Sequence, residues 1–348
     1  MLSITDCKKL LNMRTLLLLT ITCFFLSCKN EKELQVSVIQ NMGEALRTTY
    51  QIQYDGTSDL HDDFKKIFET VNRSMSTYMP DSDISRINKG DTTIVVDVYF
   101  KEVFSTSKEI WERTNGYFDP TVGILVNAYG FGPTKPIKHL DTKKVDSLMQ
   151  YVGFQKLLLT EEGNVKKQFP EIYIDFNAIA KGYTLDLLAR VLDENQVKNY
   201  LIELGGELVA KGENPQKQQL WKVGIDNPTI TDGREIFEVV QLKDVAMASS
   251  GNYRKYLTDT ETGDMYVHTI NPKTGKPQRN NVLSVSVLAE NCMLADAYAT
   301  VFMIMSLEES IAFLNENQEL EAYIIYLDEK GNLQEYITEG FKKVLVSE

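Results

Sequence analysis

The sequence predicts an α+β fold: a single domain, mostly antiparallel sheet with packed helices, in either a compact or a bilobal arrangement. Three observations support this prediction. Expected strands and helices alternate irregularly along the chain, which argues against a doubly wound parallel sheet. Many of the expected strands also follow one another in hairpin-like runs. The 348 residues are 43% hydrophobic and 25% charged, which is typical of a packed globular protein and excludes disorder, collagen and coiled coil.

Two kinds of periodicity locate the individual elements. Alternating polar and apolar residues, as in TTYQIQY, predict a half-buried strand, and apolar residues every three or four positions predict a helix. A following glycine, as in Asn115-Gly116, indicates a helix end. In chain order, the patterns predict a strand over 48–54, helices over 60–72, 98–113 and 141–151, a strand over 172–176 running into a helix over 181–192, strands over 200–204, 208–210, 221–225, 236–242, 265–269 and 283–289, helices over 293–305 and 307–315, a strand over 322–327 and a hairpin around Lys330-Gly331.

The N-terminal segment has the pattern of a bacterial lipoprotein signal. Residues 15–26 are apolar or small, and this run is too short for a membrane-spanning helix, which needs ~20 residues. Basic residues precede the run and Ser27-Cys28 follow it, as in a secretory signal whose cysteine is lipidated, although Gly or Ala is usual in place of Ser27. The alternative is a plain buried apolar segment. We expect a lipoprotein signal over 1–27 starting at Met1 or Met13, a tether over 28–40, a folded domain over 41–348, and location in the bacterial cell envelope, lipid-anchored through Cys28 and facing the periplasm.

Charge and cysteine content exclude several classes of function. The net charge is −12, and −14 after residue 27, so the chain has no general attraction to nucleic acid and needs a lipid to stay at an anionic membrane. Beyond Cys28 only Cys292 remains, so no disulfide framework is expected and this thiol should be buried. Three histidines make a zinc enzyme improbable, and the common nucleotide-loop, metalloprotease and serine-hydrolase motifs are absent.

Two glycine-containing segments are candidates for ligand binding. In DFNAIAKGY (175–183), a carboxylate ends an expected strand and Lys181-Gly182 opens a helix, whose first amides form an anion site. In ELGGE (203–207), paired glycines between strands allow a bulge or a close approach to a ligand. An ordinary capped strand–loop–helix and a simple tight bend remain alternatives for the two segments.

A third group of segments brings a histidine beside polar loops. SSGNY (249–253) and HTINPKTGKP (268–277) are rich in turn-forming and hydroxyl residues, and Pro272–Gly275 is a strong turn signal. His268 can take a proton near neutral pH, or it can be a structural residue that ties the turn to backbone. His61 and His139 are expected at the surface.

The segment ADAYAT (295–300) places a carboxylate in apolar surroundings. Asp296 and Thr300 are four residues apart on an expected helix and so share one face. Such a carboxylate needs a partner or a cation, and carboxylate, hydroxyl and carbonyl oxygens suit Mg²⁺. A salt-bridged Asp with Thr bonded to its own helix is the alternative.

Taken in order, these segments resemble the FAD:protein FMN transferase family, also called ApbE. The resemblance runs from about Glu44 to Ser306 and rests on ten short motifs. They are MSTY (75–78), DSDISRIN (81–88), GYFDPTVG (116–123), NAYGFGP (127–133), DFNAIAKGY with ELGGE, WKVGID (221–226), SSGNY, HTINPKTGKP and ADAYAT. The resemblance implies an ApbE-type, T-fold-like domain, and many family members are envelope lipoproteins.

The resemblance also implies an activity and a set of site residues. Such enzymes split FAD and attach its FMN half through a phosphoester to a Thr or Ser of a target flavoprotein, releasing AMP with the help of Mg²⁺. By resemblance, Mg²⁺ would be held by the Ala178 carbonyl, Asp296 and Thr300, and His268 would be the general base. FAD would contact residues from several motifs: Leu46, Tyr78, Tyr117, Phe118, Asp119, Asp175, Lys181 and Ile270. The acceptor would be a flavoprotein of an envelope electron-transfer or ion-pumping complex.

Two positions depart from the family pattern, and two other functions stay open. The family often has Met-Gly-Thr where this chain has Leu46-Arg47-Thr48, so Arg47 either disturbs that wall or reaches a phosphate. Some members have a second acidic residue in place of Ala299. The same motifs are compatible with an FAD pyrophosphatase, which uses water as the acceptor, and with a flavin-binding lipoprotein without catalysis.

Overall fold

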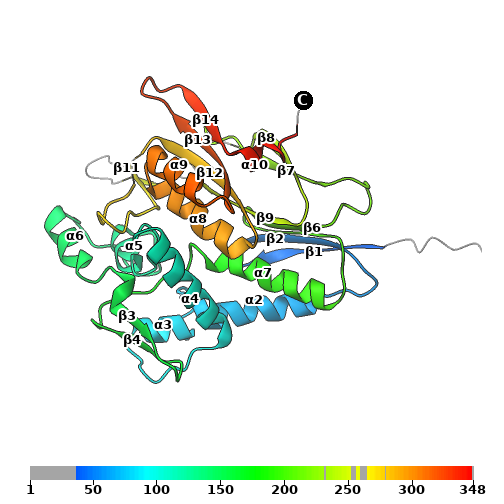
Figure 1. Cartoon of the computed structure of the whole chain (residues 1–348). Coiled ribbons are helices and arrows are strands. Elements are labelled where there is room, and N and C mark those ends of the chain that lie inside the picture. The colour runs from blue at the N-terminus through cyan, green and yellow to red at the C-terminus, as the bar shows by residue number, and fades with distance from the viewer. Residues whose placement is uncertain (1–36, 231–232, 252–255, 259–264, 279, 347–348) are drawn as a thin grey trace, which may run out of the picture. The chain divides into compact units, whose positions relative to one another are not determined.

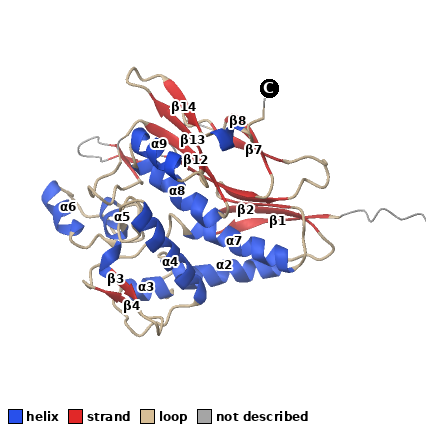
Figure 2. Cartoon of the chain, in the orientation of Figure 1, coloured by secondary structure: helices blue, strands red, loops and turns tan. Residues whose placement is uncertain are grey.

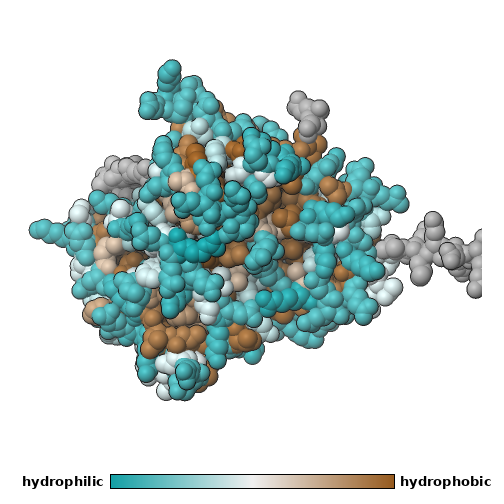
Figure 3. Space-filling model, in the orientation of Figure 1, coloured by the Kyte–Doolittle hydropathy of each residue, from teal (hydrophilic) through white to brown (hydrophobic). Residues whose placement is uncertain are grey.

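A computed structural model describes residues 37–230, 233–251, 256–258, 265–278 and 280–346. Residues 38–348 group into one compact unit. The signal prediction and the lipidation prediction at Cys28 lie outside the described residues. No helix within the described ranges combines the length and the apolar character needed to cross a bilayer. Hydrophilic residues dominate the face of the molecule shown in Figure 3.

An eight-stranded sheet forms the centre of the fold (Figure 1). Every neighbouring pair in it is antiparallel, as the hairpin-like runs predict. In spatial order the strands are β1 (Val38–Ala45), β2 (Thr48–Asp55), β5 (Tyr200–Leu204), β6 (Glu207–Lys211), β9 (Val245–Gly251), β12 (Val282–Ala289), β13 (Glu321–Leu327) and β14 (Leu333–Ile337).

Helices cover one face of this sheet (Figure 2). Helix α8 (Cys292–Ile304) packs on β9 and β12, α7 (Ala180–Glu194) packs on β5, β6 and α8, and α2 (His61–Met75) packs on α7. The remaining helices of this layer and its edges are α3 (Asp83–Asn88), α4 (Val98–Arg113), α5 (Gly123–Tyr129), α6 (Thr142–Met149), η1 (Phe154–Lys156) and α9 (Leu307–Glu316). Helix α10 (Glu339–Lys342) packs on β13 from the other face, where Phe341 is buried. Apolar residues of the sheet and the helices meet in two clusters of buried residues under the helical layer.

The opposite face of the sheet is covered by a smaller hairpin, β7 (Trp221–Asp226) with β8 (Ile236–Leu242). Strand β13 shows how the two faces are built: Ile324 belongs to the core under the helices, and its neighbours Tyr323 and Ile325 belong to the core under the hairpin. Two further strand pairs, β3 (Leu157–Leu159) with β4 (Val165–Lys167) and β10 (Tyr256–Thr258) with β11 (Met265–Val267), lie outside the large sheet.

Most expected elements are present, and one prediction is wrong. Residues 172–176 form no strand; Tyr173 makes only an isolated bridge with Val122. The side-chain amide of Asn88 takes the place of a neighbouring strand, donating to the Ile174 carbonyl at 2.8 Å and accepting from the Ile174 amide at 2.8 Å. The alternating apolar residues around Ile174 are therefore explained by their burial in the core, and not by a place in a β-sheet.

Candidate active site

One cavity of about 1350 Å³ collects all the site residues that the sequence suggested within the described ranges. It is larger than the 300–1,000 Å³ typical of small-molecule sites, so it has room for a ligand of dinucleotide size. The residues that line it include Leu46, Tyr78, Tyr117, Phe118, Asp119, Asp175, Ala178, Lys181, His268, Ile270, Asp296 and Thr300. Ser249 and Ser250 of the SSGNY segment line it too, while Asn252 and Tyr253 of that segment lie outside the described residues.

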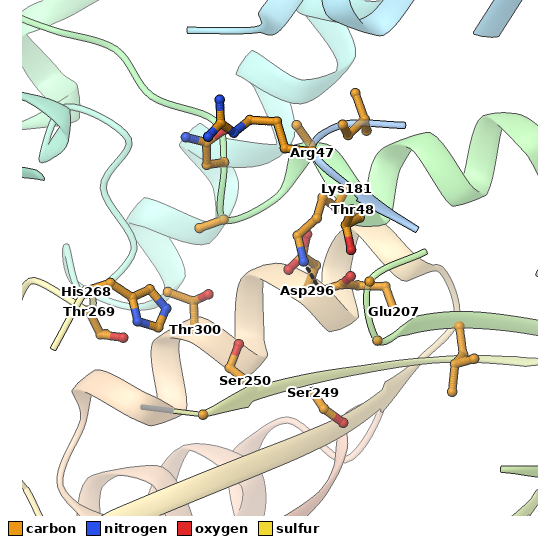
Figure 4. A pocket seen from close by; sticks show the side chains of 18 of the residues that line it. Arg47, Thr48, Lys181, Glu207, Ser249, Ser250, His268, Thr269, Asp296 and Thr300 are labelled. Carbon is orange, nitrogen blue, oxygen red and sulfur yellow. Dashed lines mark hydrogen bonds and ion pairs between the residues drawn. The ribbon is translucent and has the colours of Figure 1, made fainter. Parts of the chain in front are cut away.

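Three charged side chains, Lys181, Glu207 and Asp296, form what we call the floor of the cavity (Figure 4). They come from the first turn of α7, the start of β6 and the middle of α8. Lys181 makes an ion pair with Glu207, and Asp296 accepts a hydrogen bond from the Gly182 amide at 3.0 Å. A side chain at position 182 would place its Cβ 2.1 Å from the Cys292 carbonyl oxygen, so glycine is what lets α7 and α8 approach closely enough for this bond.

Burial dominates the electrostatics of the floor. Glu207 is 2% exposed and Asp296 4% exposed, and desolvation raises the pKa of both carboxyls against the opposing effect of Lys181. Burial by itself would lower the pKa of Lys181, but the Glu207 and Asp296 carboxylates outweigh it and raise that pKa. Two buried carboxyl groups thus share one ammonium group, and burial favours the neutral form of each against the effect of that ammonium.

The turn before α7 places the Ala178 carbonyl on the cavity wall. The N-cap of α7 is Ile179, whose side chain makes no capping bond, so the alternative of an ordinary Asp or Asn N-cap is wrong. Asp175 instead accepts from the Asn177 amide at 2.8 Å, and burial raises its pKa to about 6. Thr300 lies one turn after Asp296 on α8 and lines the same cavity, as the spacing predicts.

Arg47 and Tyr78 form the first part of the cavity rim. Leu46 and Arg47 are the two turn residues between β1 and β2, with φ of 48° and 65°, a left-handed conformation that favours glycine. A glycine would adopt this conformation without strain, which explains why glycine suits the position that Arg47 occupies in this chain. The Arg47 guanidinium lies 4.3 Å from the centre of the Tyr78 ring, so here the arginine is stacked on an aromatic wall of the cavity.

Tyr117 and Lys273 form the second part of the rim. The Tyr117 hydroxyl donates to Glu309 at 2.7 Å, and the Lys273 ammonium lies 4.1 Å from the centre of the Tyr117 ring. These contacts connect the loop after α4 with α9 and with the loop that carries His268. Desolvation and the Glu309 carboxylate raise the pKa of Tyr117 to about 12, so this hydroxyl stays a donor.

Asp119 and Phe118 line the cavity but are mostly enclosed by protein. The Asp119 carboxylate accepts from the Thr121 amide at 2.9 Å, the Thr121 hydroxyl at 2.6 Å and the Phe154 amide at 3.0 Å. Burial raises its pKa against these bonds. Asp119 therefore shapes the loop behind the wall, while the neighbouring Tyr117 presents its ring to the cavity.

His268 and Ile270 lie on the turn-rich loop after β11. The expected turn over Pro272–Gly275 is present, with the Gly275 amide bonded to the Asn271 carbonyl at 2.8 Å. His268 is half-buried on the cavity wall, and its ring meets Phe131 edge to face with centres 6.4 Å apart. Of the other histidines, His139 is exposed as expected, but His61 is half-buried and its ring nitrogen lies 2.7 Å from the Tyr50 hydroxyl.

The structure places on the floor a charged residue, Glu207, that we did not single out from sequence. Glu207 ends the ELGGE segment, after Gly205 and Gly206 with φ of 63° and 107°, so the paired glycines make a tight bend and also deliver a carboxylate to the floor. The sequence did contain a signal: a charged residue begins a strand whose other residues are mostly apolar and therefore expected to be buried, and charged residues are rarely buried without a partner. Cys292 is fully buried, as expected.

Comparisons with known proteins give one consistent result. The family model described as the ApbE family matches residues 46–324. The FAD:protein FMN transferase of Haemophilus influenzae is 34% identical over 324 residues, which covers 89% of this chain and 92% of the relative. That of Vibrio cholerae is 36% identical over 313 residues, covering 87% and 91%. The solved flavin transferase ApbE from Vibrio cholerae matches with a TM-score of 0.79 at 32% identity, covering 89% of this chain and all of that one.

Proposed function

The chain belongs to the ApbE family, and from this we propose that it is an FAD:protein FMN transferase, which moves the FMN half of FAD onto a protein acceptor. The observation that carries the proposal is one large cavity in which residues from distant motifs meet. The transfer needs a bound FAD, a positioned hydroxyl and stabilisation of charge on the pyrophosphate. The floor and rim of the cavity hold groups suited to each of these tasks.

The chemical step is a displacement at phosphorus. A Thr or Ser hydroxyl of the acceptor attacks the phosphorus next to the FMN ribityl chain, an oxygen–phosphorus bond forms, and the bond to the bridging oxygen breaks. AMP leaves with that oxygen, and His268 takes the proton of the attacking hydroxyl. Lys181, at the first turn of α7, offers an ammonium group to the pyrophosphate oxygens. Asp175, Tyr78, Tyr117 and Ile270 supply the polar and apolar walls for the rest of FAD.

Mg²⁺ fits the oxygen donors present in the cavity. The described residues contain no cluster of three or more His, Cys, Asp or Glu side chains arranged for a metal. Mg²⁺ does not need such a cluster, because it is usually held by one or two carboxylates together with water and substrate phosphates. We propose that Asp296, Thr300 and the Ala178 carbonyl hold it, and their meeting in one cavity supports this assignment. Bound Mg²⁺ would neutralise charge on the pyrophosphate.

We also propose an envelope location, with the domain tethered to the membrane by a lipid on Cys28. The signal-like order of basic, apolar and small residues before Cys28 supports this proposal. An acceptor flavoprotein of an envelope electron-transfer or ion-pumping complex would then be within reach. Mass spectrometry of the N-terminus of the mature protein tests it: a diacyl or triacyl mass on Cys28 is expected, and an intact Met1 or Met13 start would reject it.

A single incubation separates transfer from hydrolysis and from simple binding. The mature domain is mixed with FAD, Mg²⁺ and an acceptor that carries a Ser/Thr-Gly-Ala-Thr-type segment, and the acceptor mass and free AMP are measured. We expect a mass gain equal to FMN on the acceptor, with stoichiometric AMP. AMP with an unmodified acceptor would indicate a pyrophosphatase, and tight FAD binding with neither product would indicate a flavin-binding lipoprotein.

A further inference from the structure

Glu207 uses only one of its two carboxylate oxygens in the protein. Its Oε1 pairs with the Lys181 ammonium, whereas its Oε2 is buried and accepts no hydrogen bond from any residue that the structure describes. Among these residues it is the only carboxylate oxygen that is buried and unpartnered in this way. A buried acceptor without a donor costs free energy unless a ligand completes it.

Glu207 also lies in the field of Asp296. Helix α8 packs on β6 as well as on β9 and β12, so the face of α8 that carries Asp296 meets the start of β6 that carries Glu207 (Figure 4). Each of these carboxylates interacts electrostatically with Lys181. Two buried acids on neighbouring elements, beside one ammonium group, offer carboxylate oxygens of the kind that bind a divalent cation.

We propose that Glu207 is a second carboxylate of the divalent-cation site, acting through Oε2, and that Lys181 is the counter-ion that competes with the cation for these acids. The inference rests on the proposed function, because the cation is the Mg²⁺ assigned to Asp296, Thr300 and Ala178. It adds to these ligands, which lie on α8 and on the turn before α7, a residue at the start of strand β6. It also gives Lys181 two states, one turned to the acids and one available to the phosphates of FAD.

The alternative is that Glu207 only holds Lys181 in position. In that case Oε1 is sufficient, and removing the charge of Glu207 should leave metal affinity almost unchanged. The two roles therefore predict different responses to substitution at Glu207 and at Lys181, and metal binding without FAD distinguishes them.

The test is Mn²⁺ binding to the mature protein without FAD, followed by the loss of the free-ion electron paramagnetic resonance signal. Glu207→Gln should weaken Mn²⁺ binding by about 10- to 100-fold, the range seen when a residue that supports a metal site is lost. Lys181→Met should strengthen Mn²⁺ binding several-fold because it removes the competing cation. A gain in affinity cannot come from misfolding, so this variant keeps the test decisive if Glu207→Gln folds poorly.

Glu203→Gln is the matched control. Glu203 belongs to the same bend and lines the same cavity, and it accepts a hydrogen bond from the Gly206 amide at 3.0 Å, which a glutamine oxygen can also accept. It should leave Mn²⁺ affinity within about twofold, because a partly solvated charge farther from the cation is screened.

The possible results distinguish a failure of the proposed metal site from a failure of the role assigned to Glu207. If the wild-type protein binds no Mn²⁺, the proposed metal site itself fails. If the wild type binds Mn²⁺ but Glu207→Gln binds it as well as Glu203→Gln does, Glu207 is not a ligand. If Lys181→Met shows no gain, Lys181 does not compete with the cation. Either result overturns this inference and leaves the proposed function standing.

Discussion

The floor and the rim of the cavity both pair a cation with a protein group, but water reaches the two regions very differently. On the floor, Lys181 faces a carboxylate whose side chain is only 3% exposed. On the rim, the exposed Arg47 and Lys273 lie over the rings of Tyr78 and Tyr117. Charge interactions are weakly screened in the first setting and strongly screened in the second.

This difference assigns separate tasks to the two regions. Elements of regular structure position the floor, where a desolvated charge can act on a pyrophosphate and on a metal. Turns and loops position the rim, where stacking over aromatic rings orients a large ligand at modest energy. Substitutions on the floor should therefore abolish the reaction, and substitutions on the rim should mainly change affinity.

The largest effect is expected for Asp296→Asn. It removes a floor carboxylate assigned to Mg²⁺ but keeps an oxygen that can accept from the Gly182 amide, so the fold should survive. Mg²⁺-dependent AMP release should fall by more than about a hundredfold, because the metal supplies several kcal/mol of charge stabilisation. Turnover should be followed by chromatography and folding by circular dichroism. Full activity in a folded variant would remove Asp296 from the metal site.

A comparably large effect is expected for His268→Ala, but in kcat at saturating Mg²⁺ and not in the dependence on Mg²⁺. Loss of a general base typically costs about 10²- to 10⁴-fold in rate, and this loss should appear in kcat far more than in FAD affinity. The exposed His139→Ala is a matched control and should behave as wild type. If FAD affinity alone falls in His268→Ala, His268 is a binding residue and not the base.

An intermediate effect is expected in the pH dependence of stability. Asp186 on α7 accepts from the Cys292 and Met293 amides at 2.7 and 2.8 Å and so anchors the start of α8, and burial raises its pKa to about 6. A carboxyl whose folded pKa is raised favours the folded state when protonated, so its contribution is full below about pH 4 and is lost as the pH rises through about 6.

Denaturant titrations from pH 4 to pH 8 check this expectation. In the wild type, the free energy of unfolding should fall by roughly 1–3 kcal/mol between pH 4 and pH 8 because Asp186 loses its proton, and Asp186→Asn should remove this part of the pH dependence. Glu194→Gln, at an exposed position on the same helix, should leave the slope as it is in the wild type. An unchanged slope in Asp186→Asn would show that this carboxyl has an ordinary pKa.

The smallest effect is expected on the rim, at Arg47. Arg47→Ala and Arg47→Gly both remove an exposed cation–π contact and should lower FAD affinity only about two- to fivefold. Arg47→Gly should be the more stable of the two, because glycine adopts φ of 65° without strain. Calorimetry measures both quantities. A rise in FAD affinity would mean instead that Arg47 occupies the face of Tyr78 that the ligand needs.

The same contrast explains what sequence could predict about the site. Asp296 with Thr300, and Lys181 with Gly182, are recognisable because each pair lies within one helical turn. The pairing of Lys181 with Glu207 spans 26 residues and depends on how α7 packs on β6, which no local pattern encodes. The stacking of Arg47 on Tyr78 depends likewise on a turn conformation in which a non-glycine residue is unusual.

The fold shows a similar division. Helices such as α4 and strands such as β8 were predicted with matching bounds because their patterns are strong. Two strands of the large sheet were missed. Strand β1 lies at the sheet edge and has polar residues on both faces, so it lacks alternation. Strand β9 is rich in Ala and Ser, small residues that suit its close packing against α8 and that have no strong strand propensity.

The amide of Asn88, which stands in for a strand beside Ile174, has a consequence for how the enzyme can change over time. Asn88 does not line the cavity, yet its two hydrogen bonds to Ile174 hold the segment that carries Asp175 and leads to Ala178. The Asp175 amide also bonds to the Pro120 carbonyl at 2.9 Å, so Asn88 shares the positioning of this wall with the backbone of the neighbouring loop. A relative could keep every residue that touches the ligand and still have a weakened wall after one substitution at position 88.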